Sequence, residues 1–211
     1  MSNEYDKNIG FKNNLLAIDQ SSSAPSLSVQ TIATIGAVVG VVVIPTLFHF
    51  IGFVIGVGSL LGRIFLPMYL PIILVGLVAG PIAGVVAGII GPIVSFLISG
   101  MPAIAGLPAM TIELAFFGLV SGLLRGVKAS LAKKIALIQV SGLIVLFAVE
   151  LLSEIILGTG VNMSTVLATV GSTLIMGLPG LILQWALVPF VLSWAKRAGI
   201  RINNGETNES N

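Results

Sequence analysis

Residues 65–102 read FLPMYLPIILVGLVAGPIAGVVAGIIGPIVSFLISGMP and contain no charged side chain. A segment this apolar is unstable on a water-exposed surface, but it is long enough for two helices that cross a bilayer. Gly80-Pro81 is the natural reversal point, because such a dipeptide favours a turn. Small residues in this segment recur every four positions, at Gly76, Gly80, Gly84 and Gly88. We interpret the segment as a membrane hairpin whose two helices pack closely through these glycines, with the rest of the chain arranged around it.

The composition of the whole chain assigns it to the membrane proteins. Of its 211 residues, 56% are hydrophobic and only 9% are charged, whereas soluble domains carry about 25% charged residues. The chain has no cysteine, which excludes disulfides, thiolate catalysis and thiolate metal sites. A net charge of +2 gives no reason to expect a nucleic-acid partner.

The hydropathy pattern predicts an all-α fold, an integral membrane bundle of six transmembrane helices. Residues 1–29 form a polar, mostly disordered N-terminal tail, residues 30–197 form the membrane domain, and residues 198–211 form a polar C-terminal tail. The connection 51–65 is expected to dip into the bilayer against protein. Residues 163–176 are expected to form a separate surface or re-entrant helix, ended by a break at 177–180. The six spans are expected at residues 28–49, 67–80, 82–99, 108–124, 135–157 and 181–194.

The basic residues predict how this bundle is oriented. Six spans place both termini on the same side of the membrane. If that side is the cytoplasm, every Lys and Arg except Arg63 lies in a cytoplasmic segment, as the positive-inside rule requires. We therefore expect both termini in the cytoplasm and a multi-pass protein of the plasma membrane.

Polar side chains inside the predicted spans indicate a binding site. Ionisable groups are costly in lipid and usually face a cavity or a partner. At helical rise, Glu113 and Glu150 of two spans and Gln184 of a third fall at one level, in the outer third of the bilayer. Trp185 follows Gln184, and Arg63 can reach the same level from the first outer connection. These five residues form the candidate pocket for a small molecule; under the alternative, they only bridge helices.

Enzymatic chemistry has little support in this sequence. One histidine, His49, and no cysteine leave no metal cluster and no evident nucleophile–base pair. A glycine-rich phosphate loop followed by Lys and Ser or Thr is also absent. We therefore expect no enzyme, no metal and no cofactor, but a small binding protein that depends on partners to complete transport.

Several segments resemble the substrate-binding S components of energy-coupling factor (ECF) transporters. The resemblance covers about residues 30–197, with one departure at Tyr69, where a histidine is expected in many members. It is carried by the order and spacing of FLPMYLPI (65–72), Gly80-Pro81, residues 92–95, SGMP (99–102), ELAFFG (113–118) and LPGLILQ (178–184).

The resemblance implies a function and a set of partners. Such proteins capture a vitamin or related micronutrient from outside in a pocket formed by helices 4 to 6. They work with a transmembrane coupling subunit and a pair of cytoplasmic ATP-binding-cassette (ABC) ATPases. A small-xxx-small alanine motif on the first helix contacts the coupling subunit, and Ala33 and Ala37 match that motif here.

Two other functions stay open from the sequence. The chain can be a stand-alone or proton-coupled carrier, with Glu113 or Glu150 as the proton relay. It can also be a membrane scaffold without transport activity. The substrate is not identified by any motif, although the excess of carboxylates over the lone Arg63 favours a neutral or cationic small molecule.

Overall fold

The computed structural model describes residues 25–58, 60–156 and 162–197, and in this part of the chain every regular element is helical. Six of its helical segments are long and apolar enough to cross a membrane, which is the architecture of a multi-pass membrane protein. The elements are α2 (Leu27–Val54), α3 (Leu60–Phe65), α4 (Tyr69–Ala79), α5 (Pro81–Ser99), α6 (Leu107–Leu123), the 3-10 turn η1 (Leu124–Gly126), α7 (Leu131–Ile156) and α8 (Met163–Arg197).

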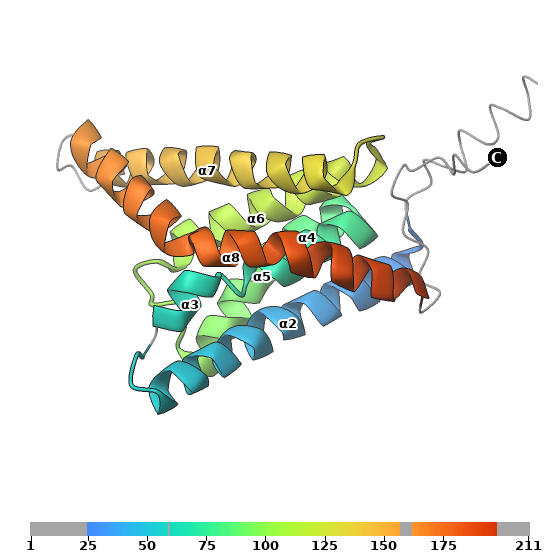
Figure 1. Ribbon diagram of the computed structural model, residues 1–211, viewed down its shortest axis with the longest axis horizontal. Helices are drawn as coiled ribbons and strands as arrows, with labels where there is room; N and C mark the ends of the chain where they lie inside the picture. Colours follow the sequence, from blue (N-terminus) through green and yellow to red (C-terminus); the bar gives the residue numbers. More distant parts are fainter. Residues whose placement is uncertain (1–24, 59, 157–161, 198–211) are drawn as a thin grey trace, which may run out of the picture.

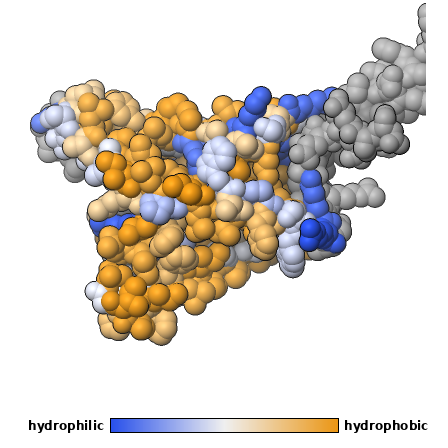
Figure 2. Space-filling model, viewed as in Figure 1, coloured by the Kyte–Doolittle hydropathy of each residue, from blue (hydrophilic) through white to orange (hydrophobic). Residues whose placement is uncertain are grey.

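The charged and apolar surfaces are arranged as a membrane bundle requires. Large hydrophobic side chains are exposed along every long helix, and Figure 2 shows this apolar surface over most of the visible face. The connection between α6 and α7, which carries Arg125 and Lys128, lies at the same end of the bundle as the end of α8 with Lys196 and Arg197 (Figure 1). That shared end is the one that the positive-inside rule predicts to be cytoplasmic.

The first helix is longer than the sequence indicated. α2 begins at Leu27, so residues 27–30 belong to the helix and not to the polar tail, and it continues to Val54 instead of ending near residue 49. Ser26 caps its start, since the Ser26 hydroxyl accepts a hydrogen bond from the Val29 amide at 3.4 Å. Residues 1–24 and 198–211, predicted as tails, lie outside the described residues.

The predicted hairpin is present, but its glycines have a different role. Gly80 connects α4 to α5 with φ 98°, a conformation that glycine adopts without steric penalty, and Pro81 starts α5. The prediction that these glycines pack the two helices of the hairpin against each other is wrong. A Cβ atom on Gly76 or Gly84 would collide with the backbone of Gly118, and one on Gly88 with the backbone of Leu114, both on α6. The glycines therefore bring α6, rather than the other arm, into backbone contact.

The connection before α4 is partly helical and packs on protein. α3 lies against α8 (Figure 1), and a Cβ atom on Gly180 would collide with the backbone of Phe65. Leu66, between α3 and α4, has φ 47°, which is uncommon for a residue with a side chain. Together, Leu60–Ala79 form one apolar segment of 20 residues.

The predicted division of the last span is wrong. Met163–Arg197 is one helix of 35 residues, with Pro179 and Pro189 inside it, and Figure 1 shows it bending along its length. A proline removes one backbone hydrogen bond and displaces the preceding turn, so a helix commonly bends there. In a bilayer, bending a helix costs less free energy than ending it, because a broken helix leaves several polar backbone groups without a hydrogen-bond partner.

Packing is uneven across the bundle. The buried residues of α7 are Lys134, Ile135, Ile138 and Gly142, all in its first half. Beyond Gly142, α7 has no buried residue up to its end at Ile156. In the first half of α8, only Val166 and Val170 are buried before Gly177. α7 and the first half of α8 thus form a loosely packed wall beside a dense body of α4, α5 and α6.

Candidate functional site

Two hollows lie beside the middle of α8, and Leu66 lines both of them. The larger, of about 490 Å³ including its open mouth, we call the carboxylate hollow. The smaller, of about 320 Å³ including its mouth, we call the aromatic hollow. The walls of the carboxylate hollow are Leu66, Tyr69, Glu113, Phe117, Gln139, Gly142, Leu143, Leu146, Thr173, Leu174, Gly177 and Leu181.

Glu113 and Tyr69 form the polar centre of the carboxylate hollow. The Tyr69 hydroxyl donates a hydrogen bond of 2.6 Å to Glu113 Oε2, a length typical of a bond to a charged acceptor. Both side chains are more than nine-tenths buried, at 8% and 9% exposure. Phe117, one helical turn after Glu113, meets the Tyr69 ring edge to face with the ring centroids 4.8 Å apart. The hydrogen bond to Glu113 and the ring contact with Phe117 therefore fix the position of the Tyr69 side chain.

An amide network borders the same hollow on α7 and α8. Gln139 Nε2 donates to the Leu181 carbonyl at 3.1 Å and to Gln184 Oε1 at 3.4 Å. Trp185 Nε1 donates to Gln139 Oε1 at 2.9 Å. Gln139 thus connects α7 to the bend region of α8. It also fixes the orientation of the two polar side chains that the sequence singled out on α8.

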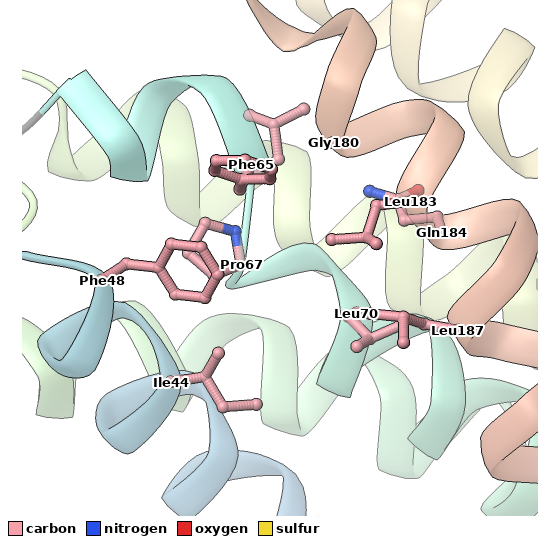
Figure 3. A pocket seen from close by; sticks show the side chains of 10 residues that line it. Ile44, Phe48, Phe65, Pro67, Leu70, Gly180, Leu183, Gln184 and Leu187 are labelled. Atoms are coloured by element: carbon pink, nitrogen blue, oxygen red, sulfur yellow. The ribbon is translucent and has the colours of Figure 1, made fainter. Parts of the chain in front are cut away.

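The aromatic hollow lies on the other side of Leu66. Figure 3 shows Phe48, Phe65 and Pro67 on one side and Leu183 and Gln184 on the other. The rings of Phe48 and Phe65 lie 5.4 Å apart, centroid to centroid. Gln184 is 3% exposed, and its Nε2 has no hydrogen-bond partner in the described part of the chain. This hollow therefore offers an apolar surface and one unused donor.

The predicted site residues divide into three groups. Glu113 lines the carboxylate hollow and Gln184 the aromatic hollow, while Trp185, at 42% exposure, is joined to them through Gln139. Glu150, half-buried on α7, lines neither hollow. Arg63 is exposed on α3 and lines neither hollow. Binding roles for all five stay predictions.

The predicted coupling residues face the chain's own core. Ala37 is buried at 6% exposure, and Ala33 is half-buried against the same core. The small residue that faces outward on this part of α2 is Gly36, around which a Cβ atom would meet nothing within 4 Å. A partner subunit would reach Ala37 only by displacing contacts inside the bundle, whereas Gly36 is open to it.

Sequence reasoning missed two residues of the site. Tyr69 was noted only as a departure from a family pattern. Its position in the sequence, 44 residues before Glu113, gives no sign that the two side chains are in contact. Gln139 did have a signal, because an amide in the middle of an otherwise apolar span needs a hydrogen-bond partner.

Comparison with known proteins gave no relative. The chain matched no family model, no curated protein and no solved structure. Its fold class and membrane character therefore stand on the sequence and the structure alone.

Proposed function

We propose that this chain is the membrane-embedded substrate-capture subunit of an ATP-driven importer of the ECF type. It binds a water-soluble vitamin or precursor from outside and releases it inside. A transmembrane coupling subunit and two ABC-type ATPases, in the plasma membrane, drive this release. The observation that carries the capture function is the carboxylate hollow, where Tyr69 and Glu113 place a bonded polar pair in an apolar wall. The resemblance stated above supports the partners.

The location of the site fits capture from one side. Glu113 lies in the first half of α6, the half farther from the basic connection between α6 and α7. With that connection in the cytoplasm, Glu113 faces the outer half of the membrane. A mostly apolar wall with a few fixed polar groups is typical of small-molecule sites.

Thermal unfolding of the purified chain with a panel of water-soluble vitamins tests the capture function. A ligand that binds the folded chain stabilises it by an amount that grows with the logarithm of its concentration over its dissociation constant, so the unfolding temperature rises with ligand concentration. The variant Glu113→Gln should lose that shift, and Glu154→Gln, at the far end of α7, should keep it. A shift that survives Glu113→Gln would move the site elsewhere, and a panel without any shift would contradict capture of vitamins.

Uptake by cells with and without the ATPases tests the coupling. The proposal expects no accumulation when the ATPases are deleted. The partner contact is best probed with Gly36→Trp, because this position points away from the bundle, while Ala37→Trp would disturb the core. Complexes that survive Gly36→Trp would exclude this face of α2.

The second candidate is a proton-coupled carrier, favoured by two carboxylates, Glu113 and Glu150, on the adjacent helices α6 and α7. Two carboxylates on neighbouring helices can pass a proton between them. Uptake that collapses with an uncoupler and ignores ATP depletion would favour this carrier over the ATP-driven importer.

A further inference from the structure

We infer that the carboxylate hollow takes a ligand with a protonated amine, which Glu113 binds as the countercharge. This inference rests on the proposed capture function and names the class of substrate for the same site. Three features carry it: the unused oxygen of Glu113, the absence of a basic side chain from the wall, and the aromatic faces beside the carboxylate.

Glu113 has bonding capacity that the protein does not use. The Tyr69 hydroxyl bonds Oε2, and Oε1 accepts no hydrogen bond from the described residues. A carboxylate has about four acceptor positions, so several stay open. Because Glu113 lines the hollow and is nine-tenths buried, a donor that satisfies these positions must come from the hollow itself.

The charge around Glu113 is unbalanced. Tyr69 on α4 bonds to Glu113, Glu150 lies on the adjacent helix α7, and no Lys, Arg or His among the described residues lines the hollow. Arg63 is exposed on α3, and His49 lies against Gly62 of that helix. A buried carboxylate without a cation is costly. A cationic ligand removes that cost, whereas an anionic ligand increases it.

The walls suit the remainder of such a ligand. Phe117 and Tyr69 present ring surfaces next to Glu113, and an ammonium group over an aromatic face gains additional attraction when water is excluded. The other walls are leucines, glycines and Thr173. An amine with one apolar or aromatic substituent matches this combination. The competing explanation is that Glu113 binds a proton, in which case a neutral ligand is preferred.

Three probes of similar shape distinguish these cases: benzylamine, benzyl alcohol and benzoate. Each is added to the purified full-length chain at neutral pH, where benzylamine is a cation and benzoate an anion. Binding is followed by calorimetry and by the fluorescence of Trp185, which is bonded to the wall residue Gln139. We expect benzylamine to bind at least about ten-fold more tightly than benzyl alcohol, since a hydrogen bond to a charged group contributes about 1.5–3 kcal/mol.

Variants connect that preference to Glu113. Glu113→Gln keeps the size of the side chain and removes its charge, so it should abolish the preference for benzylamine over benzyl alcohol. Glu154→Gln is the matched control and should behave as the native chain. The ranking of the three probes on the native chain also stands without any variant, so a folding defect in Glu113→Gln does not prevent the test.

Each contrary outcome has a separate meaning. If benzoate or benzyl alcohol binds the native chain as tightly as benzylamine, the amine inference is overturned while the capture function stands. If Glu113→Gln keeps the full preference for benzylamine, Glu113 is not the countercharge and the inference is also overturned. If no probe binds at millimolar concentration, the amine inference is overturned, whereas the capture function fails only if the vitamin panel also gives no shift.

Discussion

The α4–α5–α6 body and the α7–α8 wall are built from the same apolar residue types but pack in opposite ways. In the body, glycines allow backbones to touch, as Gly84 does with Gly118. In the wall, α7 has no buried residue after Gly142, and Gly171 of α8 has nothing within 4 Å of where a Cβ atom would lie. The candidate site lies at the boundary between them. Its carboxylate thus lies on α6 of the dense body, whereas its amides, Gln139 and Gln184, lie on α7 and α8.

The largest expected effect comes from adding bulk to the body. Gly84→Leu would push a side chain into the Gly118 backbone, which cannot move aside as a flexible side chain can. We expect a loss of about 3 kcal/mol or more of unfolding free energy, because overpacking a dense interior typically costs 1–3 kcal/mol when neighbours can adjust. Thermal unfolding followed by tryptophan fluorescence measures this loss.

The matched variant adds the same bulk to the wall. Gly171→Leu places its side chain in open space, and replacing a helical glycine favours the helix by about 0.5–1 kcal/mol. Its unfolding temperature should be equal to that of the native chain or higher. Equal destabilisation by the two variants would show that the contrast between body and wall is wrong.

A smaller effect is expected at the boundary, with Tyr69→Phe. This change keeps the ring contact with Phe117 but leaves Glu113 without its donor. Losing a hydrogen bond to a charged acceptor costs about 2 kcal/mol, measured as unfolding free energy in the absence of ligand. If stability is unchanged, Glu113 has another donor or water in place of Tyr69.

The smallest expected effect is a gain, and not a loss, of unfolding free energy. Gln184→Leu removes a buried amide whose Nε2 has no partner in the described part of the chain, at the cost of one long hydrogen bond from Gln139. We expect the unliganded protein to gain up to about 1 kcal/mol, measured by thermal unfolding. Ligand-dependent stabilisation should decrease in the same variant if Gln184 serves binding at the expense of stability. A destabilised variant would indicate that a structural water occupies the position.

Much of the fold could be predicted, because hydropathy alone determines which segments cross a bilayer. The turn at Gly80-Pro81 was correct for a local reason, since backbone conformation is decided there by two residues. The glycine contacts were not predictable, because spacing along one helix does not say which neighbour it meets. The length of α8 was missed because proline and glycine end helices in water but bend them in lipid.

The polar residues of the site could be predicted from the sequence, but their hydrogen-bond partners and contacts could not. Glu113 and Gln184 stand out as polar groups in apolar spans. Their separation into two hollows depends on Leu66, an apolar residue that no pattern in the sequence distinguishes. Tyr69 and Gln139 were missed as partners because each bond crosses more than forty residues of chain.

Leu66 also affects how the substrate specificity of such a protein can change during evolution. It divides the two hollows from a position between helices, and its backbone adopts a conformation, φ 47°, that costs about 1 kcal/mol or more for a residue with a side chain. A substitution by glycine would relieve that cost and remove a side chain that lines both hollows. We expect such a variant to accept a longer molecule without any change in the helices that hold the fold together.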